Sequence, residues 1–184
     1  MRERLPRFQP VQLAPAQREL YEQITAGPRA QGPQHFALTD ENGALRGPFN
    51  AFLLAPPLGQ ALQELGAGIR YRTGLTARAR EAAILLVAAR WDSAFEREAH
   101  EAVGRAAGLT ESELAALTGG DVPDFANREE AACARLTIAL LDGEVDDVLW
   151  REEVEVIGRE RVFELTVLVG YYSMVALQLR VFRV

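Results

Sequence analysis

Residues 76–109 constrain the fold of this chain more than any other stretch, because two helical patterns meet there at a sharp turn. The first pattern begins at Thr76, a good N-cap residue, and continues through an apolar run at residues 82–89. Asp92 and Ser93 interrupt it with turn-forming and cap-forming side chains, and a second pattern follows. Alanine, leucine, glutamate and arginine dominate both halves, so the stretch predicts an antiparallel pair of helices.

Such a hairpin brings polar residues from both helices to one place. Glu81 lies ten residues before Trp91, and His100 lies nine residues after it. At a rise of about 1.5 Å per residue, both lie roughly 14 Å from the turn, so they face each other across the seam between the helices. Ser93, Glu96 and His100 follow the spacing i, i+3, i+7, which places them on one helix face. Glu81 is an ionisable group in an otherwise apolar helix, and such a group needs a partner or a function.

Each of these four residues also has a purely structural interpretation. Glu81 could lie on the surface and pair with Arg78 or Arg80, and Glu96 could be solvated beside Arg97. His100 could be a partly buried histidine with satisfied hydrogen bonds, and Ser93 could be a helix N-cap. The coincidence of all four on one seam is what favours a functional site, because groups with perturbed titration gather at such sites.

The rest of the chain is predicted to be helical as well, since no segment alternates polar and apolar residues as a strand does. Caps, prolines and glycines delimit further helices near residues 15–26, 48–54, 56–69, 111–119, 125–141, 148–157 and 160–182. The last helix is apolar on nearly all sides, so we expect the domain or a subunit partner to bury it, with Tyr171 and Tyr172 in the core. The fold class is therefore predicted to be all-α.

Length and charge limit what such a chain does. We expect one domain over residues 1–184, with an extended N-terminal arm at 1–14 and a long loop at 27–48. The net charge of −6 argues against a general nucleic-acid role. No apolar run is long enough to span a membrane, and the first ten residues lack the apolar region of a signal peptide, so we expect a cytoplasmic protein without a membrane partner. One cysteine and two histidines show no zinc-ligand spacing, so we expect neither a metal nor another cofactor.

The hairpin resembles the carboxymuconolactone decarboxylase family, which includes the alkyl hydroperoxidase D proteins. The hydroperoxidase branch has a Glu, eleven residues, and then Cys-x-x-Cys-x-x-x-His, and these positions fall on Glu81, Ser93, Glu96 and His100. The segments RGPFNAFLLAPPLGQALQELG and ELTVLVGYYSMVALQL also look like the longer members of this family, so the resemblance covers about residues 45–182. It implies an alkyl hydroperoxidase D-like helical bundle built on a central antiparallel hairpin, assembled as a homo-oligomer, typically a trimer or hexamer.

The departure from the family pattern concerns the thiols. Ser93 and Glu96 occupy both redox cysteine positions, and Cys133 lies on a different predicted helix. Because the dithiol peroxidase cycle needs a thiolate and a resolving thiol, we expect this peroxiredoxin-type activity of the family to be absent. A one-cysteine peroxidase at Cys133 is a weaker alternative, since nothing nearby in sequence lowers its pKa.

The family's namesake reaction implies a carboxy-lyase that acts on a small lactone or related organic acid in aromatic compound catabolism. In this hypothesis His100 donates a proton, Glu81 orients the imidazole, and Ser93, Glu96 and Trp91 line the pocket. An anionic substrate also needs a cationic anchor, for which Arg46 and Arg72 are candidates by position. The competing hypothesis is a non-catalytic or stress-related family member that keeps the helical scaffold. A cavity containing His100 beside Glu81 would favour the enzyme, and a seam closed by side chains would favour the scaffold.

Overall fold

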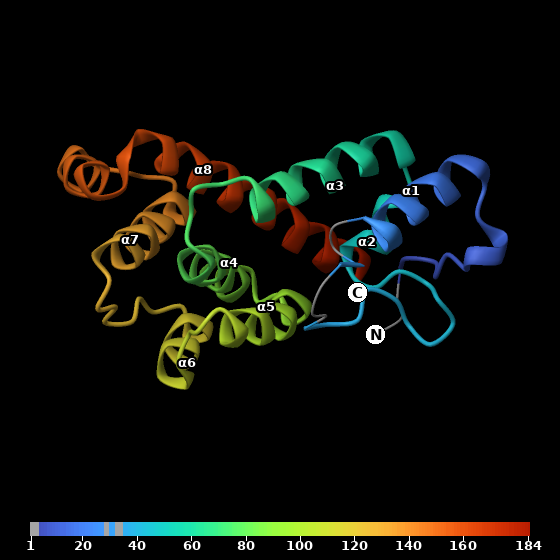
Figure 1. The fold of residues 1–184 in the computed structure, drawn as a ribbon, viewed down its shortest axis with the longest axis horizontal. Helices are drawn as coiled ribbons and strands as arrows, with labels where there is room; N and C mark the ends of the chain where they lie inside the picture. The colour runs from blue at the N-terminus through green and yellow to red at the C-terminus, as the bar shows by residue number, and fades with distance from the viewer. Residues whose placement is uncertain (1–3, 28–29, 32–34) are drawn as a thin grey trace. The chain divides into compact units, whose positions relative to one another are not determined.

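The computed structural model describes residues 4–27, 30–31 and 35–184, and the fold is all-α (Figure 1). Within these residues the one β-bridge joins Thr39 to Leu45. The helices are a short 3-10 helix η1 (Pro10–Gln12), α1 (Pro15–Ala26), α2 (Pro48–Phe52), α3 (Pro56–Tyr71), α4 (Ala77–Trp91), α5 (Ala94–Ala106), α6 (Glu111–Gly119), α7 (Arg128–Asp142) and α8 (Asp147–Phe182).

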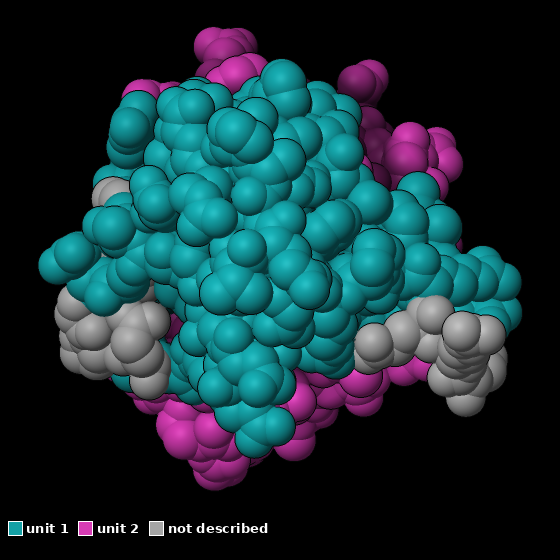
Figure 2. Space-filling model, turned by 90° about the vertical axis from the view of Figure 1, so that its right-hand side faces the viewer, with its two compact units in different colours: residues 1–72, 177–184 teal, residues 73–176 magenta. Residues whose placement is uncertain are grey.

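The chain divides into two compact units, which Figure 2 distinguishes by colour. Unit 1 comprises residues 1–72 and 177–184, and unit 2 comprises residues 73–176. The single domain over residues 1–184 stays a prediction. Unit 2 contains the hairpin, and its internal packing is what positions the candidate site.

Helices α4 and α5 form the hairpin with the boundaries that the sequence predicts. The Thr76 hydroxyl accepts a hydrogen bond from the Ala79 N–H at 3.1 Å and so caps the start of α4. Asp92 ends the helix in the left-handed conformation, with φ of 49°, and the Ser93 N–H donates to the Ala88 carbonyl at 2.9 Å. The chain then reverses at once into α5.

Helix α4 lies at the centre of unit 2 and contacts α5, α6 and α7. From Glu81 to Ala88 it is buried on all sides, which explains why its apolar residues form a continuous run rather than a stripe. The core around it consists of Ala82, Leu85, Leu86, Leu109, Leu114, Leu117, Phe125 and Ala134. The predicted capping box opens α6, with the Glu113 N–H donating to the Thr110 hydroxyl and the Thr110 N–H donating to the Glu113 carboxylate.

Arg78 joins the start of α4 to three other segments of unit 2. Its Nε donates to both carboxylate oxygens of Glu130 on α7, at 3.0 Å each, and its Nη2 donates to Glu113 on α6 at 2.6 Å. Its Nη1 donates to the Gly108 carbonyl after α5, and the guanidinium lies 5.9 Å from the centre of the Phe125 ring. The hydrogen bond that Arg78 donates to Glu113 raises the pKa of Arg78 above its usual value, so the guanidinium stays charged.

Helix α8 consists of two helical stretches that meet at Gly158. Its φ of 78° and ψ of 158° lie outside the helical region, in a conformation that favours glycine, and the sequence predicts this break. Within one chain the second stretch is not covered on all sides, since Phe163 is 69% exposed. By length and composition α8 could cross a membrane, with a mean hydropathy of 1.5 in an 18-residue window that is half buried in the structure. One such helix is weak evidence for a membrane span, because core helices pass the same test.

In unit 1, helices α1, α2 and α3 surround a second core, and Asn50 on α2 holds the N-terminal arm. The Asn50 amide donates to the Pro6 carbonyl at 2.9 Å, and its oxygen accepts from the Phe8 N–H at 3.2 Å. The described part of the arm at 1–14 therefore packs on the protein. The predicted loop at 27–48 contains no α-helix among its described residues before Pro48, and residues 1–3, 28–29 and 32–34 lie outside the described residues.

We predict that Arg78→Ala lowers the free energy of unfolding by about 3 kcal/mol, because it leaves the buried Glu130 carboxylate without its cation. Urea denaturation followed by circular dichroism measures the change. Arg105→Ala is the matched control, since the Arg105–Glu111 ion pair is exposed to water, and we expect its unfolding midpoint to stay unchanged. Equal effects of the two substitutions would contradict the structural role of Arg78.

Candidate functional site

The hairpin brings Glu81 and His100 into direct contact. The Nδ1 atom of His100 lies 2.6 Å from Oε2 of Glu81, and the two side chains are 8% and 1% exposed. Nε of Arg80 lies 3.3 Å from the other carboxylate oxygen, so the buried charge of Glu81 faces both a cation and an imidazole. Gly104, one turn beyond His100, makes room for Leu109 and Leu114, since a Cβ atom there would lie 2.9 Å from Leu109 Cδ1 and 3.3 Å from Leu114 Cδ2.

This contact determines which nitrogen of His100 is free to act on a ligand. A carboxylate accepts hydrogen bonds, so Nδ1 carries the proton that it donates to Glu81. Nε2 is then the nitrogen that is left for proton transfer, as in other carboxylate–histidine pairs. The Tyr172 ring packs edge-on against the imidazole, with ring centres 5.2 Å apart and an interplanar angle of 89°. Glu81 and Tyr172 thus hold the ring from two sides.

Ser93 and Glu96 lie on the same helix face as His100, and both are buried. Among the described residues, neither the Ser93 hydroxyl nor Oε2 of Glu96 has a hydrogen-bond partner. The solvated interpretation of Glu96 is wrong, because Glu96 is buried and Arg97 pairs with Asp92 instead. Ser93 is the N-cap residue of α5, as its structural interpretation has it, but its side chain makes no capping hydrogen bond. Native proteins rarely leave buried polar atoms unpaired, so two such atoms beside a histidine indicate a place for a ligand or water.

The environment of Glu96 changes its protonation. Burial raises the pKa of Glu96 to about 7, charge on His100 lowers it, and the Glu81 carboxylate raises it. Near neutral pH a substantial fraction of Glu96 is therefore the uncharged carboxylic acid, which can donate a hydrogen bond.

The structure places the other predicted site residues elsewhere. Trp91 lines a hollow of about 350 Å³ together with Leu140, Thr166 and Gly170. Arg46 and Arg72 belong to unit 1, where Arg46 lines a separate surface hollow and Arg72 is exposed at the end of α3. Their roles as cationic anchors stay predictions.

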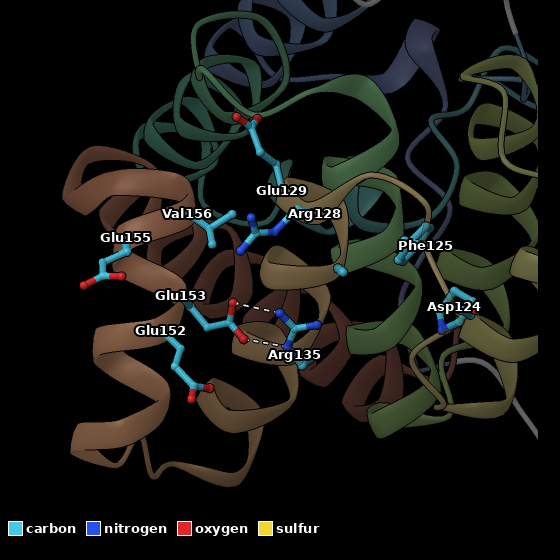
Figure 3. A pocket seen from close by; sticks show the side chains of 11 residues that line it. Asp124, Phe125, Arg128, Glu129, Arg135, Glu152, Glu153, Glu155 and Val156 are labelled. Carbon is cyan, nitrogen blue, oxygen red and sulfur yellow. Dashed lines mark hydrogen bonds and ion pairs between the residues drawn. The ribbon is translucent and has the colours of Figure 1, made fainter.

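A larger hollow of about 940 Å³ lies between α7 and the first stretch of α8 (Figure 3). Charged side chains dominate its lining, and Arg135 donates from two nitrogens to the buried Glu153 carboxylate at 2.5 and 2.9 Å. Both carboxylate oxygens of Glu153 are paired with Arg135, so we interpret this ion pair as a structural contact between α7 and α8. His100 and Glu81 line none of the hollows described above, so the predicted cavity around this pair stays a prediction.

The structure also bears on a thiol role for Cys133 and on metal binding. Burial raises the pKa of Cys133 to about 12, so its thiolate scarcely forms at neutral pH and a peroxidatic role is disfavoured. In the part of the chain that the structure describes, no three His, Cys, Asp or Glu side chains are arranged to hold a metal ion.

We predict that Glu96→Gln stabilises the protein relative to the wild type at high pH. Between about pH 4.5 and pH 7 the folded protein holds a proton that the unfolded chain has lost, so the wild-type free energy of unfolding falls as the pH rises. The difference should reach about 3 kcal/mol above pH 7 and vanish below pH 4.5. Urea denaturation at several pH values measures it, with Glu98→Gln on the exposed side of α5 as control. A difference that does not vary with pH would contradict the buried acid.

One family model matches the chain: the carboxymuconolactone decarboxylase family model covers residues 56–137, from the start of α3 into α7. The matched segment contains all four polar residues of the hairpin seam, and it confirms the family that the hairpin resembles. No curated protein matches the chain. The chain is thus similar to the carboxymuconolactone decarboxylase family over residues 56–137, the segment that contains the hairpin.

Proposed function

We propose that this protein catalyses proton transfer on a small lactone or related organic acid, without a cofactor, in a decarboxylation like that of 4-carboxymuconolactone. The observation that carries this proposal is the buried Glu81–His100 contact at 2.6 Å, next to two buried oxygen atoms that lack partners among the described residues. A histidine held by a carboxylate through Nδ1 is a typical general acid or base.

The reaction balances with these residues alone. When the substrate carboxylate leaves as CO₂, the electron pair of the broken carbon–carbon bond stays on the lactone as a dienolate. In its doubly protonated form, with the Nδ1 proton donated to Glu81, His100 then gives the proton on Nε2 to the carbon atom, and Nε2 regains a proton from solvent water. Glu81 binds the imidazole through Nδ1, so the ring orientation is fixed and Nε2 is the nitrogen left for the substrate.

A second candidate is a non-catalytic or stress-related member of the family that uses the helices as a scaffold. The burial of the seam favours it, since the side chains of Glu81 and His100 are almost fully enclosed. In that case the ion pair would serve only to hold α4 against α5. Assay of the purified protein separates the two candidates.

We further propose a cytoplasmic homo-oligomer, a trimer or hexamer, that uses the exposed face of α8. Phe163, Thr166 and Gly170 follow the spacing i, i+3, i+7 and are all exposed. Beside them, the small residues of α8 and apolar side chains from α4 and α7 form the hollow of about 350 Å³. A surface with small and apolar residues at helical spacing suits a helix of a second copy.

We predict that the protein decarboxylates 4-carboxymuconolactone and that His100→Gln lowers kcat/KM by about 10²- to 10⁴-fold, because the proton donor is lost. Glu81→Gln should lower it by about 10- to 100-fold, because the imidazole loses its orientation. A spectrophotometric assay of the lactone measures both.

The matched control is His35→Gln, since His35 is the other histidine and is exposed in unit 1. We expect its turnover to equal that of the wild type, and hydroperoxide reduction to stay at background in every variant. An inactive wild type on this and related lactones would leave the scaffold as the better candidate.

We predict that Gly170→Glu lowers the assembly mass in solution. A Cβ atom at Gly170 meets nothing within 4 Å, so the substitution leaves the chain's own fold intact but places a charge on the proposed interface. Gly68→Glu on α3 is the matched control, because its Cβ also meets nothing within 4 Å. Light scattering after size exclusion measures the mass, and a monomeric wild type or an unchanged Gly170→Glu assembly would show the proposal to be wrong.

A further inference from the structure

Two buried oxygen atoms on α5 have no role in the proton transfer described above. We propose that Glu96, as an uncharged carboxylic acid, donates a hydrogen bond from Oε2 to the substrate carbonyl oxygen that becomes an enolate oxygen, with the Ser93 hydroxyl as second donor. The inference rests on the proposed function and deepens it, since it names a substrate class: lactones or ketones whose carbonyl is conjugated to the carbon that receives the proton.

The positions of the three side chains on α5 support this assignment. Glu96 lies one turn before His100, and Ser93 precedes it by three residues, so all three share one helix face. Glu96 is 3% exposed and Ser93 is 7% exposed, yet among the described residues neither the hydroxyl nor Oε2 has a partner. A buried donor without an acceptor is expensive in free energy, and a substrate oxygen supplies that acceptor.

The charged groups around Glu96 explain why its neutral form suits this role. Glu81 approaches from α4, His100 follows on α5, and Tyr172 on α8 covers the imidazole edge. Arg80 contacts Glu81, so its charge is already paired. A second ionised carboxylate beside Glu81 would repel an enolate, whereas a carboxylic acid would stabilise it.

Hydrogen bonds from such donors strengthen as negative charge develops on the carbonyl oxygen. They therefore stabilise the dienolate more than the neutral lactone, and the intermediate more than the substrate. The carboxylate that leaves as CO₂ has to face away from Glu96, because the carbonyl oxygen occupies both donors. The site thus has a carbonyl end at Ser93 and Glu96 and a proton-donating end at His100.

Tetronate tests this inference, because it is a five-membered lactone that exists as an enolate at neutral pH. We expect the wild type to bind tetronate about 90-fold more weakly at pH 9 than at pH 6, following the fraction of protonated Glu96 with its pKa of about 7. Isothermal titration calorimetry measures the affinity. The neutral γ-butyrolactone should bind weakly at both pH values.

Three variants separate the contributions. Glu96→Gln keeps a donor at every pH, so its affinity should stay within about 3-fold of the wild-type value at pH 6 and lose the steep pH dependence. Glu96→Leu lacks the donor and should bind at least about 10-fold more weakly at pH 6. His100→Gln should keep the loss of affinity between pH 6 and pH 9. Thermal unfolding checks that each variant is folded, and Glu98→Gln should bind like the wild type.

The outcomes distinguish this inference from the proposed function. A wild type that does not bind tetronate, a flat wild-type pH profile, or an equal loss in Glu96→Gln and Glu96→Leu would overturn the role of Glu96. Binding with the expected profile but without turnover of 4-carboxymuconolactone would overturn the proposed reaction and leave the enolate site in place. If neither Glu96→Gln nor Glu96→Leu changes the turnover of 4-carboxymuconolactone, and if tetronate affinity does not vary with pH, only the inference about Glu96 would be overturned.

Discussion

The contact between Glu81 and His100 is the interaction on which the candidate site depends. Glu81 is 1% exposed at the start of the buried stretch of α4, and a buried carboxylate without a partner would destabilise the fold. His100 supplies the partner from the neighbouring helix, at 2.6 Å. This contact therefore aligns α4 with α5 and orients the imidazole at the same time. Removing either group would break this buried hydrogen bond, so stability and the proposed chemistry are coupled at this point.

The packing of unit 2 makes this alignment rigid. Helix α4 is enclosed by its neighbours, and Arg78 at its start binds carboxylates on α6 and α7 as well as the carbonyl of Gly108 beyond α5. The two ends of the hairpin are thus held by hydrogen bonds, at Arg78 on one side and at the turn around Asp92 on the other. Between these ends Glu81 cannot rotate away from the seam, because side chains surround it. A proton-transfer site benefits from such a fixed geometry, since its donor has to meet the substrate in one orientation.

The sequence predicts the hairpin, the helix boundaries and the facing of Glu81 and His100, because caps, turn residues and helical spacing are local signals. The sequence alone does not determine whether Glu96 is exposed or buried, because a glutamate next to Arg97 is consistent with both. Its burial depends on tertiary packing. Ser93 presents the same problem: its position is that of an N-cap, but its hydroxyl does not use the position. The edge contact of Tyr172 with His100 joins residues far apart in the chain, and helical periodicity alone contains no signal for it. Local patterns thus predict which residues share a face, whereas burial and long-range partners need the structure.

In the hydroperoxidase pattern that the hairpin resembles, thiols occupy the positions of Ser93 and Glu96, and a hydroxyl and a carboxyl group there support different chemistry. A cysteine pair exchanges electrons with a peroxide, and neither Ser93 nor Glu96 has a sulfur atom to oxidise. Both can donate hydrogen bonds to oxygen, and the raised pKa of Glu96 makes its donor form accessible near neutral pH. The His100–Glu81 pair serves either chemistry, since both need a proton donor at a fixed place. Under the proposed function the chain uses this pair for acid–base chemistry, and the buried oxygens of Ser93 and Glu96, which lack partners among the described residues, take the place of the thiols.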